Sequence, residues 1–224
     1  MLLSGGLDSA VLVAEEAARS LVQPIYISVG LAWEAAERRA VDDFLAHVPA
    51  RTRVKPLVAL RVEMTDVYSA AHWAVTGQAP AYHTPDEDVY LPGRNIVLFS
   101  KAAIFCAMSG ITRIAIGTLD HNPFPDATPT FRERLADALS LGLDRRIDIA
   151  APYARTSKAD VIRRGTAIGA PLALTLSCMS PEYSGDGFPR HCGTCSKCRE
   201  RHEAFLDAGI SDPTSYADTR FVIK

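Results

Sequence analysis

The sequence predicts an α/β protein whose parallel sheet is doubly wound, as in Rossmann-like folds, followed by a C-terminal tail of different composition. Short apolar and β-branched runs alternate with runs whose apolar residues recur at helical spacing, which is typical of a parallel sheet with helices on both faces. The first apolar run ends in a Ser-Gly-Gly turn that leads directly into a helical pattern. Beyond about Ala173 the composition turns to cysteine, glycine and proline.

The first third of the chain contains three predicted strands and two predicted helices. Residues 1–3 are apolar and form a short first strand before the glycine turn. Residues 8–20 and 33–47 carry apolar side chains every three or four positions, which predicts helices. Residues 24–29 and 54–62 are rich in β-branched and other apolar residues, which predicts the second and third strands.

The middle of the chain continues the alternation around a long loop. Residues 65–76 are interpreted as a helix, and residues 77–90 have prolines and acidic residues without any periodicity. Long loops of this kind in compact domains are often lids or binding loops. Residues 96–108 predict a helix and residues 112–117 a strand, after which residues 118–129 form a polar, proline-rich segment at the carboxyl end of that strand.

The last regular elements of the main domain are a helix over residues 131–141, a short strand over 147–149 and a helix over 157–168. We therefore expect an α/β domain over residues 1–172 and a C-terminal segment over residues 173–224 that packs on it. In doubly wound sheets, ligands bind beyond the carboxyl ends of the strands, so the glycine turn should lie at the binding site.

Composition and charge narrow the functional classes. The 224 residues include 24 Lys and Arg against 26 Asp and Glu, and 48% are hydrophobic. A net charge of −2 gives no general attraction to nucleic acid, so no nucleic-acid partner is expected. The sequence contains no apolar run of about 18 residues that would span a membrane. We expect a cytoplasmic protein, because cysteines crowded into one short segment suit a metal site in a reducing compartment.

The turn at residues 4–9, Ser-Gly-Gly-Leu-Asp-Ser, has the composition of an anion site. Gly5 and Gly6 permit positive φ angles and close approach to the main chain. A strand tip, a glycine turn and a helix N-terminus together offer unpaired N–H groups, which favour phosphate. Ser4 and Ser9 add hydroxyl donors, and Asp8 adds a magnesium ligand. An ordinary tight turn between a strand and a helix is the alternative interpretation.

The second strong signal is a set of cysteines in the tail. Four thiolates can close a tetrahedral Zn²⁺ site, and here they would be Cys178, Cys192, Cys195 and Cys198. His191 is a rival ligand, although its position next to Cys192 makes it sterically awkward. A redox pair or a disulfide is less natural for a C-x-x-C-x-x-C sequence. A closed four-ligand site is structural, and the separate Cys106 is interpreted as a core residue.

Three further segments carry charged groups that suit an anionic ligand. Arg94 precedes an apolar helix and could neutralise a phosphate or carboxylate, or serve as a solvated cap. Asp120 and Asp126 flank a proline-held turn, which suits ligand contact or an Asx turn. Lys158 opens a helix, where it opposes the helix dipole, so an anionic partner is expected.

These motifs resemble those of a known superfamily and of one family within it. SGGLDS is similar to the pyrophosphate loop of ATP pyrophosphatases, which cleave ATP between the α and β phosphates. Five motifs, taken in order, resemble those of the 7-cyano-7-deazaguanine synthases of queuosine and deazapurine biosynthesis. They are SGGLDS, Pro92-Gly93-Arg94-Asn95, the Pro-Asp-Ala step at 125–127, Ser157-Lys158 and the terminal C…CGTCSKCRER.

The resemblance implies an adenine nucleotide α-hydrolase-like fold and an ATP-dependent ligase. Such an enzyme converts 7-carboxy-7-deazaguanine and ammonia to the nitrile through an acyl-adenylate and an amide, releasing AMP and pyrophosphate. ATP and Mg²⁺ are the implied cofactors, Zn²⁺ would occupy the cysteines, and a homodimer is implied.

Specific roles follow for the matching residues. Asp8, Arg94 and Lys158 are the predicted catalytic residues. The substrate contacts are predicted to be Arg94, Asn95, Asp120 and Asp126. The predicted ATP-binding residues are Leu3, Ser4, Gly5, Gly6, Leu7, Asp8 and Ser9.

The chain departs from the family pattern at positions that bear on the acceptor. The stretch after the second strand keeps only its glycine, in Val29-Gly30-Leu31-Ala32-Trp33, and Leu7 stands where Gln is commoner. Residues 180–187 lengthen the step from Cys178 to Cys192. A relative that activates a different carboxylate, or one that thiolates tRNA, is therefore an alternative, and a zinc-knuckle binding module with a degenerate nucleotide fold is a third.

Overall fold

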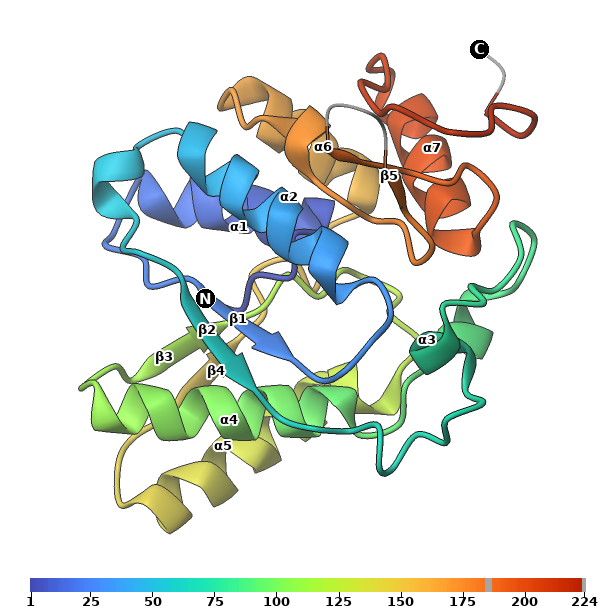
Figure 1. Ribbon diagram of the computed structural model, residues 1–224. Helices are drawn as coiled ribbons and strands as arrows, with labels where there is room; N and C mark the ends of the chain where they lie inside the picture. The colour runs from blue at the N-terminus through green and yellow to red at the C-terminus, as the bar shows by residue number, and fades with distance from the viewer. Residues whose placement is uncertain (184–186, 223–224) are drawn as a thin grey trace.

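Two pairs of parallel strands lie on either side of the first three residues in the computed structural model, which describes residues 1–183 and 187–222 (Figure 1). β1 (Ile25–Ser28) pairs with β2 (Val58–Arg61), and β3 (Arg113–Ala115) pairs with β4 (Asp148–Ala150). The N–H of Leu2 donates to the carbonyl of Ala115 at 2.9 Å, and the N–H of Leu3 donates to the carbonyl of Ile25 at 2.9 Å. The α/β class with parallel strands is confirmed, and the strand stub contacts both pairs.

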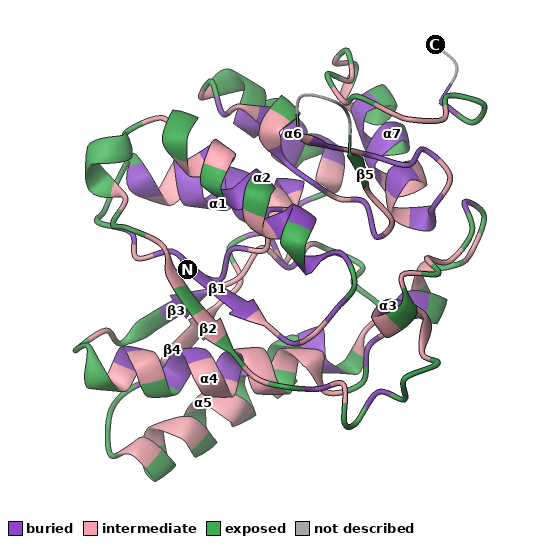
Figure 2. Ribbon diagram, in the orientation of Figure 1, coloured by how far each residue is buried: buried purple, intermediate pink, exposed green. Residues whose placement is uncertain are grey.

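Helices cover the strands on two sides (Figure 1). α1, α2 and α6 lie on one side, and α4 and α5 lie on the other. Each side has its own apolar cluster, one built around α1 and one around α4. Figure 2 shows buried residues along β1 and α1. The helices are α1 (Leu7–Ala17), α2 (Glu34–His47), α3 (Trp73–Thr76), α4 (Arg94–Met108), α5 (Pro129–Leu143), α6 (Lys158–Ala167) and α7 (Ser196–Ala208).

The predicted helix over residues 65–76 is wrong for most of its length. Only Trp73–Thr76 is helical, and turns precede it. Residues 65–69 are Thr, Asp, Val, Tyr and Ser, all poor helix formers. The Tyr68 hydroxyl donates to the carbonyl of Pro92 at 3.0 Å, which ties the segment to the start of α4. The segment before Trp73 is therefore irregular chain with a tertiary contact at Tyr68.

The tail after residue 173 packs against the main body through α6 and α7, which lie next to each other. β5 (Glu182–Tyr183) pairs with β6 (Pro189–Arg190) in an antiparallel ribbon. Of the additional residues 180–187, positions 184–186 lie outside the described residues. The described helices include none that is both long and apolar enough to cross a bilayer.

Candidate active site

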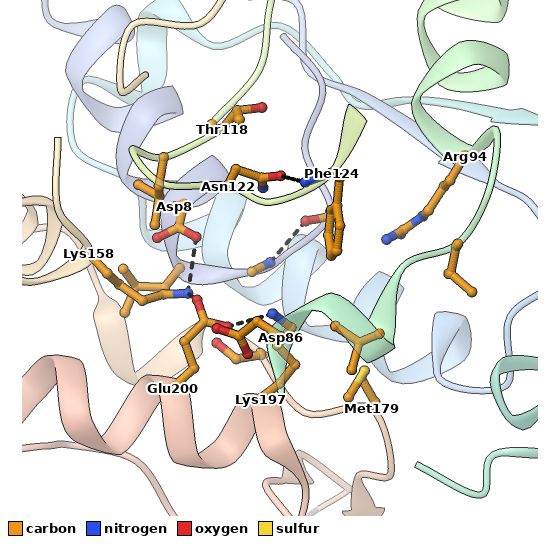
Figure 3. Close-up of a pocket in the computed structure, with 18 of the residues that line it drawn as sticks. Asp8, Asp86, Arg94, Thr118, Asn122, Phe124, Lys158, Met179, Lys197 and Glu200 are labelled. Carbon is orange, nitrogen blue, oxygen red and sulfur yellow. Dashed lines mark hydrogen bonds and ion pairs between the residues drawn. The ribbon is translucent and has the colours of Figure 1, made fainter. Parts of the chain in front are cut away.

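A cleft of about 340 Å³ opens where the parallel strands end, and we call it the central cleft. Ser4 follows the first strand stub, and Gly117 and Thr118 follow β3, so the strand ends supply its floor. A hollow of about 240 Å³ adjoins it and shares Asp8 and Arg94 with it. The polar residues in the central cleft include those that the sequence predicts to be catalytic: Asp8, Arg94 and Lys158 (Figure 3).

The glycine turn presents the start of α1 to the central cleft. Gly5 has a φ of +81°, and a Cβ there would lie 3.1 Å from the carbonyl oxygen of Glu37. Gly6 is the N-cap of α1 and no side chain caps the helix, which leaves its first N–H groups available to an anion. The Ser9 hydroxyl donates to the carbonyl of Gly6 at 3.0 Å and so fixes the turn.

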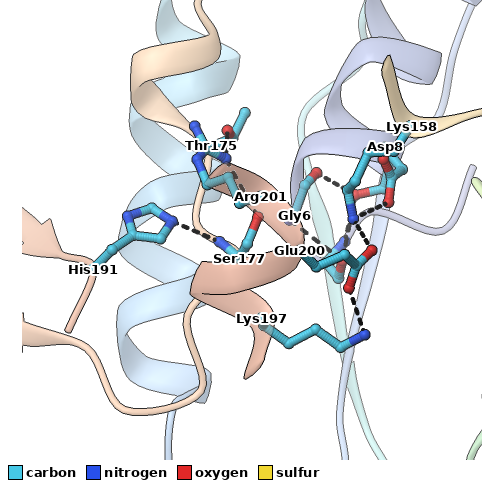
Figure 4. A network of polar contacts seen from close by, with 11 residues as sticks. Gly6, Asp8, Lys158, Thr175, Ser177, His191, Lys197, Glu200 and Arg201 are labelled. Carbon is cyan, nitrogen blue, oxygen red and sulfur yellow. Dashed lines mark hydrogen bonds and ion pairs between the residues drawn. The ribbon is translucent and has the colours of Figure 1, made fainter. Parts of the chain in front are cut away.

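Four charged side chains alternate in sign along one wall of the central cleft (Figure 4). The ammonium of Lys158 lies 3.3 Å from the Asp8 carboxylate and contacts the Glu200 carboxylate on its other side. The other oxygen of Glu200 accepts from the ammonium of Lys197 at 2.6 Å. Asp8 and Lys158, two of the candidate catalytic residues, are therefore in contact with each other. We call the set Asp8, Lys158, Lys197 and Glu200 the charged wall.

The charged wall keeps Lys158 protonated despite its burial. Burial disfavours the ammonium, but the carboxylates of Asp8 and Glu200 outweigh burial and raise the pKa of Lys158. Burial would raise the pKa of Glu200, but the ammonium groups of Lys158 and Lys197 outweigh burial and lower it. For Asp8 burial prevails over Lys158 and raises the pKa. Unlike Glu200, Asp8 thus has too little positive charge around it to offset the effect of burial on its carboxylate.

Asp8 also has an oxygen available for a cation. Its Oδ1 is buried and has no hydrogen-bond partner among the described residues. Carboxylate oxygens are the ligands that Mg²⁺ uses when it is also bound by substrate phosphates. The unpaired oxygen fits an Mg²⁺ ligand at Asp8.

Arg94 and Asn95 begin α4 on the other side of the central cleft. The Asn95 N–H donates to Asp126 Oδ2 at 3.1 Å, and its Nδ2 donates to Asp126 Oδ1 at 3.1 Å. Asp126 is only 4% exposed, and burial raises its pKa although Asn95 opposes this. Its carboxylate is therefore occupied in holding the first turn of α4, from which Arg94 reaches the central cleft. Asp120 lines the cleft and accepts from the N–H of His121.

The central cleft also contains residues that the sequence did not identify. Trp33 and Trp73 line it, and their rings stack with centroids 5.8 Å apart. Glu37 accepts from Trp33 Nε1 at 3.1 Å and from the Tyr26 hydroxyl at 2.9 Å. Burial raises the pKa of Glu37 to about 7, with Arg94 acting in the opposite direction. Among Trp33, Trp73, Glu37 and Tyr26, only Trp33 lies in a segment that the sequence relates to the acceptor.

Lys197 and Glu200 are not among the site residues predicted from sequence, because the pattern of the tail indicates a metal segment alone. A signal was present, since Lys197 lies inside the cysteine motif and Glu200 follows it three residues later, on the same face of a helix. Nothing in the sequence shows, however, that this face turns toward the glycine turn.

The four tail cysteines converge, and their positions suit a metal ion. All their sulfur atoms lie within 4.8 Å of one another. Three of the distances are 3.9 Å for Cys178–Cys195, 3.8 Å for Cys192–Cys198 and 3.5 Å for Cys195–Cys198. A tetrahedral site with Zn–S bonds of about 2.3 Å has edges of about 3.8 Å. The cluster can therefore hold a metal such as zinc.

Main-chain donors support this cysteine cluster, and His191 has another role. The N–H of Cys192 donates to the sulfur of Cys178 at 3.2 Å, and the N–H of Gly193 donates to the sulfur of Cys198 at 3.4 Å. His191 Nε2 accepts from the N–H of Ser177 at 3.0 Å. Cys106 is 1% exposed and packs in the apolar cluster around α4, which confirms it as a core residue.

The family model and the relatives that match this chain point to the same family. Residues 1–209 match the family model described as "Queuosine biosynthesis protein QueC". Proteins named 7-cyano-7-deazaguanine synthase are similar over nearly the whole chain. The protein from Pseudomonas syringae pathovar syringae is 32% identical over 96% of this chain and 94% of its own. That from Azoarcus is 33% identical over 96% and 95%, and that from Methanoculleus marisnigri is 33% identical over 96% and 96%.

A more distant likeness comes from solved structures. A crystal structure described as a predicted subunit of tRNA methyltransferase from Methanocaldococcus jannaschii has a TM-score of 0.45 and 14% identity, covering 98% of this chain and 91% of that chain.

Proposed function

The chain belongs to the QueC family and is an enzyme of the 7-cyano-7-deazaguanine synthase type in queuosine biosynthesis, and we propose that its central cleft performs this reaction with ATP. In the proposed reaction, 7-carboxy-7-deazaguanine and ammonia become 7-cyano-7-deazaguanine. The observation that carries the proposal is the meeting of the glycine turn, Asp8 and Lys158 in one cleft at the strand ends.

The proposed chemistry activates a poor acyl donor twice. A carboxylate oxygen of the substrate bonds to the α-phosphorus of ATP, and pyrophosphate leaves. Ammonia then bonds to the carbonyl carbon, a proton is lost, and AMP leaves to give the amide. The amide oxygen then bonds to the α-phosphorus of a second ATP, and a second pyrophosphate leaves. Loss of AMP and protons from this adenylated amide gives the nitrile. No covalent bond to the protein is needed, so the protein's contribution is positioning and charge neutralisation.

The residues of the glycine turn are assigned to the pyrophosphate half of ATP. Ser4, Gly5, Gly6 and Ser9, with Leu3 and Leu7 on either side, would place the phosphates at the start of α1. Mg²⁺ bound at Asp8 would supply positive charge to the phosphate oxygens. Lys158 would stabilise the charge that develops as pyrophosphate leaves. We further propose that the strand pairs form one doubly wound sheet, as in adenine nucleotide α-hydrolases.

The acceptor is assigned to the opposite side of the central cleft. Arg94 presents a guanidinium whose buried Nε has no partner among the described residues, and we assign it to the carboxylate of the acceptor. Asn95 and Asp126 hold Arg94 in place, and Asp120 lies at the cleft edge. The stacked pair Trp33 and Trp73 provides a flat apolar wall that suits a fused heteroaromatic ring.

The cysteine cluster is assigned to a structural Zn²⁺ within residues 173–224. Four protein ligands leave no open position for substrate. We propose a cytoplasmic location, because free thiols that bind a metal suit a reducing compartment. The family resemblance also suggests a homodimer.

One alternative has an observation in its favour. Leu31 and Trp33 differ from the family pattern, and Trp33 lines the central cleft, so a related carboxylate is the second candidate acceptor. Thiolation of tRNA is disfavoured, because the cysteines of the chain lie in the tail cluster or in the core and not among the residues that line the central cleft.

Mass spectrometry of the reaction tests the assignment. The metal-loaded protein is incubated with 7-carboxy-7-deazaguanine, ATP, Mg²⁺ and ammonium, and we expect the amide first and then the nitrile, together with AMP and pyrophosphate. Absence of both products contradicts the acceptor assignment. Pyrophosphate release with another carboxylate, and not with this one, would support the second candidate.

A further inference from the structure

The charged wall receives two of its four members from the cysteine-bearing tail. Lys197 and Glu200 lie in the first turns of α7, whose N-cap is Cys195. Both side chains line the central cleft together with Ser4, Gly6 and Asp8. Figure 4 shows the ammonium groups of Lys158 and Lys197 on opposite sides of the Glu200 carboxylate. The tail therefore brings a second cation to the proposed phosphate site.

We propose that Lys197 is a second phosphate-binding lysine, which acts beside Lys158 on the pyrophosphate half of ATP. This inference rests on the proposed function, because it takes the glycine turn as the phosphate site. It adds a catalytic residue from the tail to a reaction whose other phosphate contacts come from the main body.

Charge balance supports the assignment. Without Lys197 the wall would contain one ammonium against the carboxylates of Asp8 and Glu200, and a triphosphate would approach a net negative surface. With Lys197 the wall is neutral, so bound Mg²⁺ makes it positive. Ammonium groups bind phosphate oxygens as mobile point charges, and Lys197 is 27% exposed, which allows its ammonium to reach a ligand in the central cleft.

The alternative role for Lys197 is to neutralise the thiolates that flank it in sequence. The hydrogen bond of its ammonium runs to Glu200 at 2.6 Å and not to a sulfur atom. The sulfur atoms of Cys192 and Cys198 instead accept from the main-chain N–H groups of Thr194 and Gly193, at 3.4 Å each. The geometry therefore directs the charge of Lys197 toward the central cleft.

The cysteine cluster fixes the position of the main chain at Lys197. Cys195 and Cys198 hold the residues on both sides of Lys197, and the N–H of Ser196 donates to the carbonyl of Pro80 at 3.1 Å. A metal in this cluster would therefore anchor the start of α7 and, with it, the position of Lys197. The metal would be structural for the fold and would also position a group that contacts substrate.

Binding of inorganic pyrophosphate with Mg²⁺ tests the proposal without turnover. Calorimetric titration of the metal-loaded wild type is compared with Lys197→Met and Lys197→Arg. We expect Lys197→Met to raise the Kd by roughly tenfold or more, as for loss of one charge-assisted contact, and Lys197→Arg to recover most of the affinity. The KM for ATP should rise in parallel, whereas binding of 7-carboxy-7-deazaguanine alone stays unchanged.

Two controls separate the role of Lys197 from general effects. Lys101→Met on α4 removes the same charge away from the central cleft and should leave pyrophosphate binding unchanged. Metal analysis of Lys197→Met should give the wild-type metal content. Loss of metal with an unchanged pyrophosphate Kd would show that Lys197 serves the cysteines, and would overturn the proposal.

The outcome is distinguishable from failure of the proposed function. If the wild type forms no nitrile but binds pyrophosphate in a manner that depends on Lys197, the acceptor assignment fails and this inference stands. If nitrile forms and Lys197→Met binds pyrophosphate within twofold of wild type, only this inference fails. A wild type that does not bind pyrophosphate or ATP overturns both.

Discussion

Lys158 remains charged in a position that disfavours a cation for two reasons. It lies at the first residue of α6, next to the positive end of the helix dipole, and its side chain is only 14% exposed. The contacts with Asp8 and Glu200 outweigh both effects and raise its pKa. A lysine whose pKa is raised above its ordinary value remains a cation at neutral pH, which suits a group that neutralises phosphate.

The first prediction concerns this lysine. Lys158→Gln should lower the rate of pyrophosphate release by at least about 100-fold, because removal of one preorganised charged donor from a transition state has an effect of this size. The measurement is pyrophosphate release with ATP, Mg²⁺, ammonium and 7-carboxy-7-deazaguanine. Lys101→Gln on α4 is the matched control. Unchanged turnover in Lys158→Gln would remove Lys158 from the catalytic residues.

The second prediction concerns Glu37, a residue that is 8% exposed and whose carboxyl has its pKa raised by burial to about 7 from the usual 4.5. Between these two values the folded protein holds more protons at Glu37 than the unfolded chain. The free energy of unfolding therefore falls as pH rises through this window, by up to about 3 kcal/mol in total.

Glu37→Gln removes this pH dependence. Relative to wild type, the ligand-free variant should gain stability from about pH 5 to about pH 8, measured by urea denaturation. Glu133→Gln, at an exposed position on α5, serves as control and should show no such trend. If the free energy of unfolding differed by the same amount between wild type and Glu37→Gln at pH 5 and at pH 8, the raised pKa of Glu37 would be contradicted.

At the scale of elements, helical spacing predicted α4 well and residues 65–76 badly. The apolar spacing over residues 96–108 coincides with a real helix, which starts two residues earlier because Gly93, with a φ of +78°, ends the preceding loop. Residues 65–76 carry a weaker pattern and many poor helix formers, and their conformation depends on contacts such as Tyr68 with Pro92. Local periodicity contains no information about such contacts.

Local sequence likewise contains no information about the tertiary contacts that build the central cleft. Asp8, Arg94 and Lys158 were candidates from sequence because each lies in a short motif at the end of a strand or start of a helix, and all three line the central cleft; their catalytic roles stay a prediction. Lys197 and Glu200 could not be identified in this way, because their role depends on how α7 packs against α6, near the start of α1. The contact of Asp126 with substrate stays a prediction, and its carboxylate also accepts from Asn95, a pairing between residues 31 positions apart that local sequence does not reveal.

The third prediction tests the cysteine cluster as an element. Cys195→Ser should lose the bound metal and lower the melting temperature by on the order of 10 °C, because metal binding contributes to folding free energy. The measurements are metal analysis and thermal denaturation of the purified protein. Cys106→Ser makes the same chemical change in the core around α4 and should keep the metal. Full metal content in Cys195→Ser would exclude Cys195 as a ligand.

At the scale of the whole molecule, the tail and the main body share one interior. Arg201 is fully buried, and its guanidinium donates to the carbonyl of Leu172 at 2.9 Å. It also donates to the Thr175 hydroxyl at 2.8 Å (Figure 4). Ala204 and Phe205 of α7 belong to the same apolar cluster as α1. A boundary near residue 173 therefore separates two compositions but crosses a continuous core.

The last prediction follows from this continuity. A chain that ends at residue 172 would expose the surface that Phe205 covers and leave the carbonyl of Leu172 without its donor, so we expect it to aggregate or to lack a cooperative thermal transition. The full chain should unfold in one transition whose calorimetric and van't Hoff enthalpies agree. Arg201→Met in the full chain should lower the temperature of that single transition without dividing it, because it removes donors shared by both segments. If residues 1–172 alone were soluble and unfolded cooperatively, the tail would be an independent unit, and its metal could not position Lys197 through a shared core.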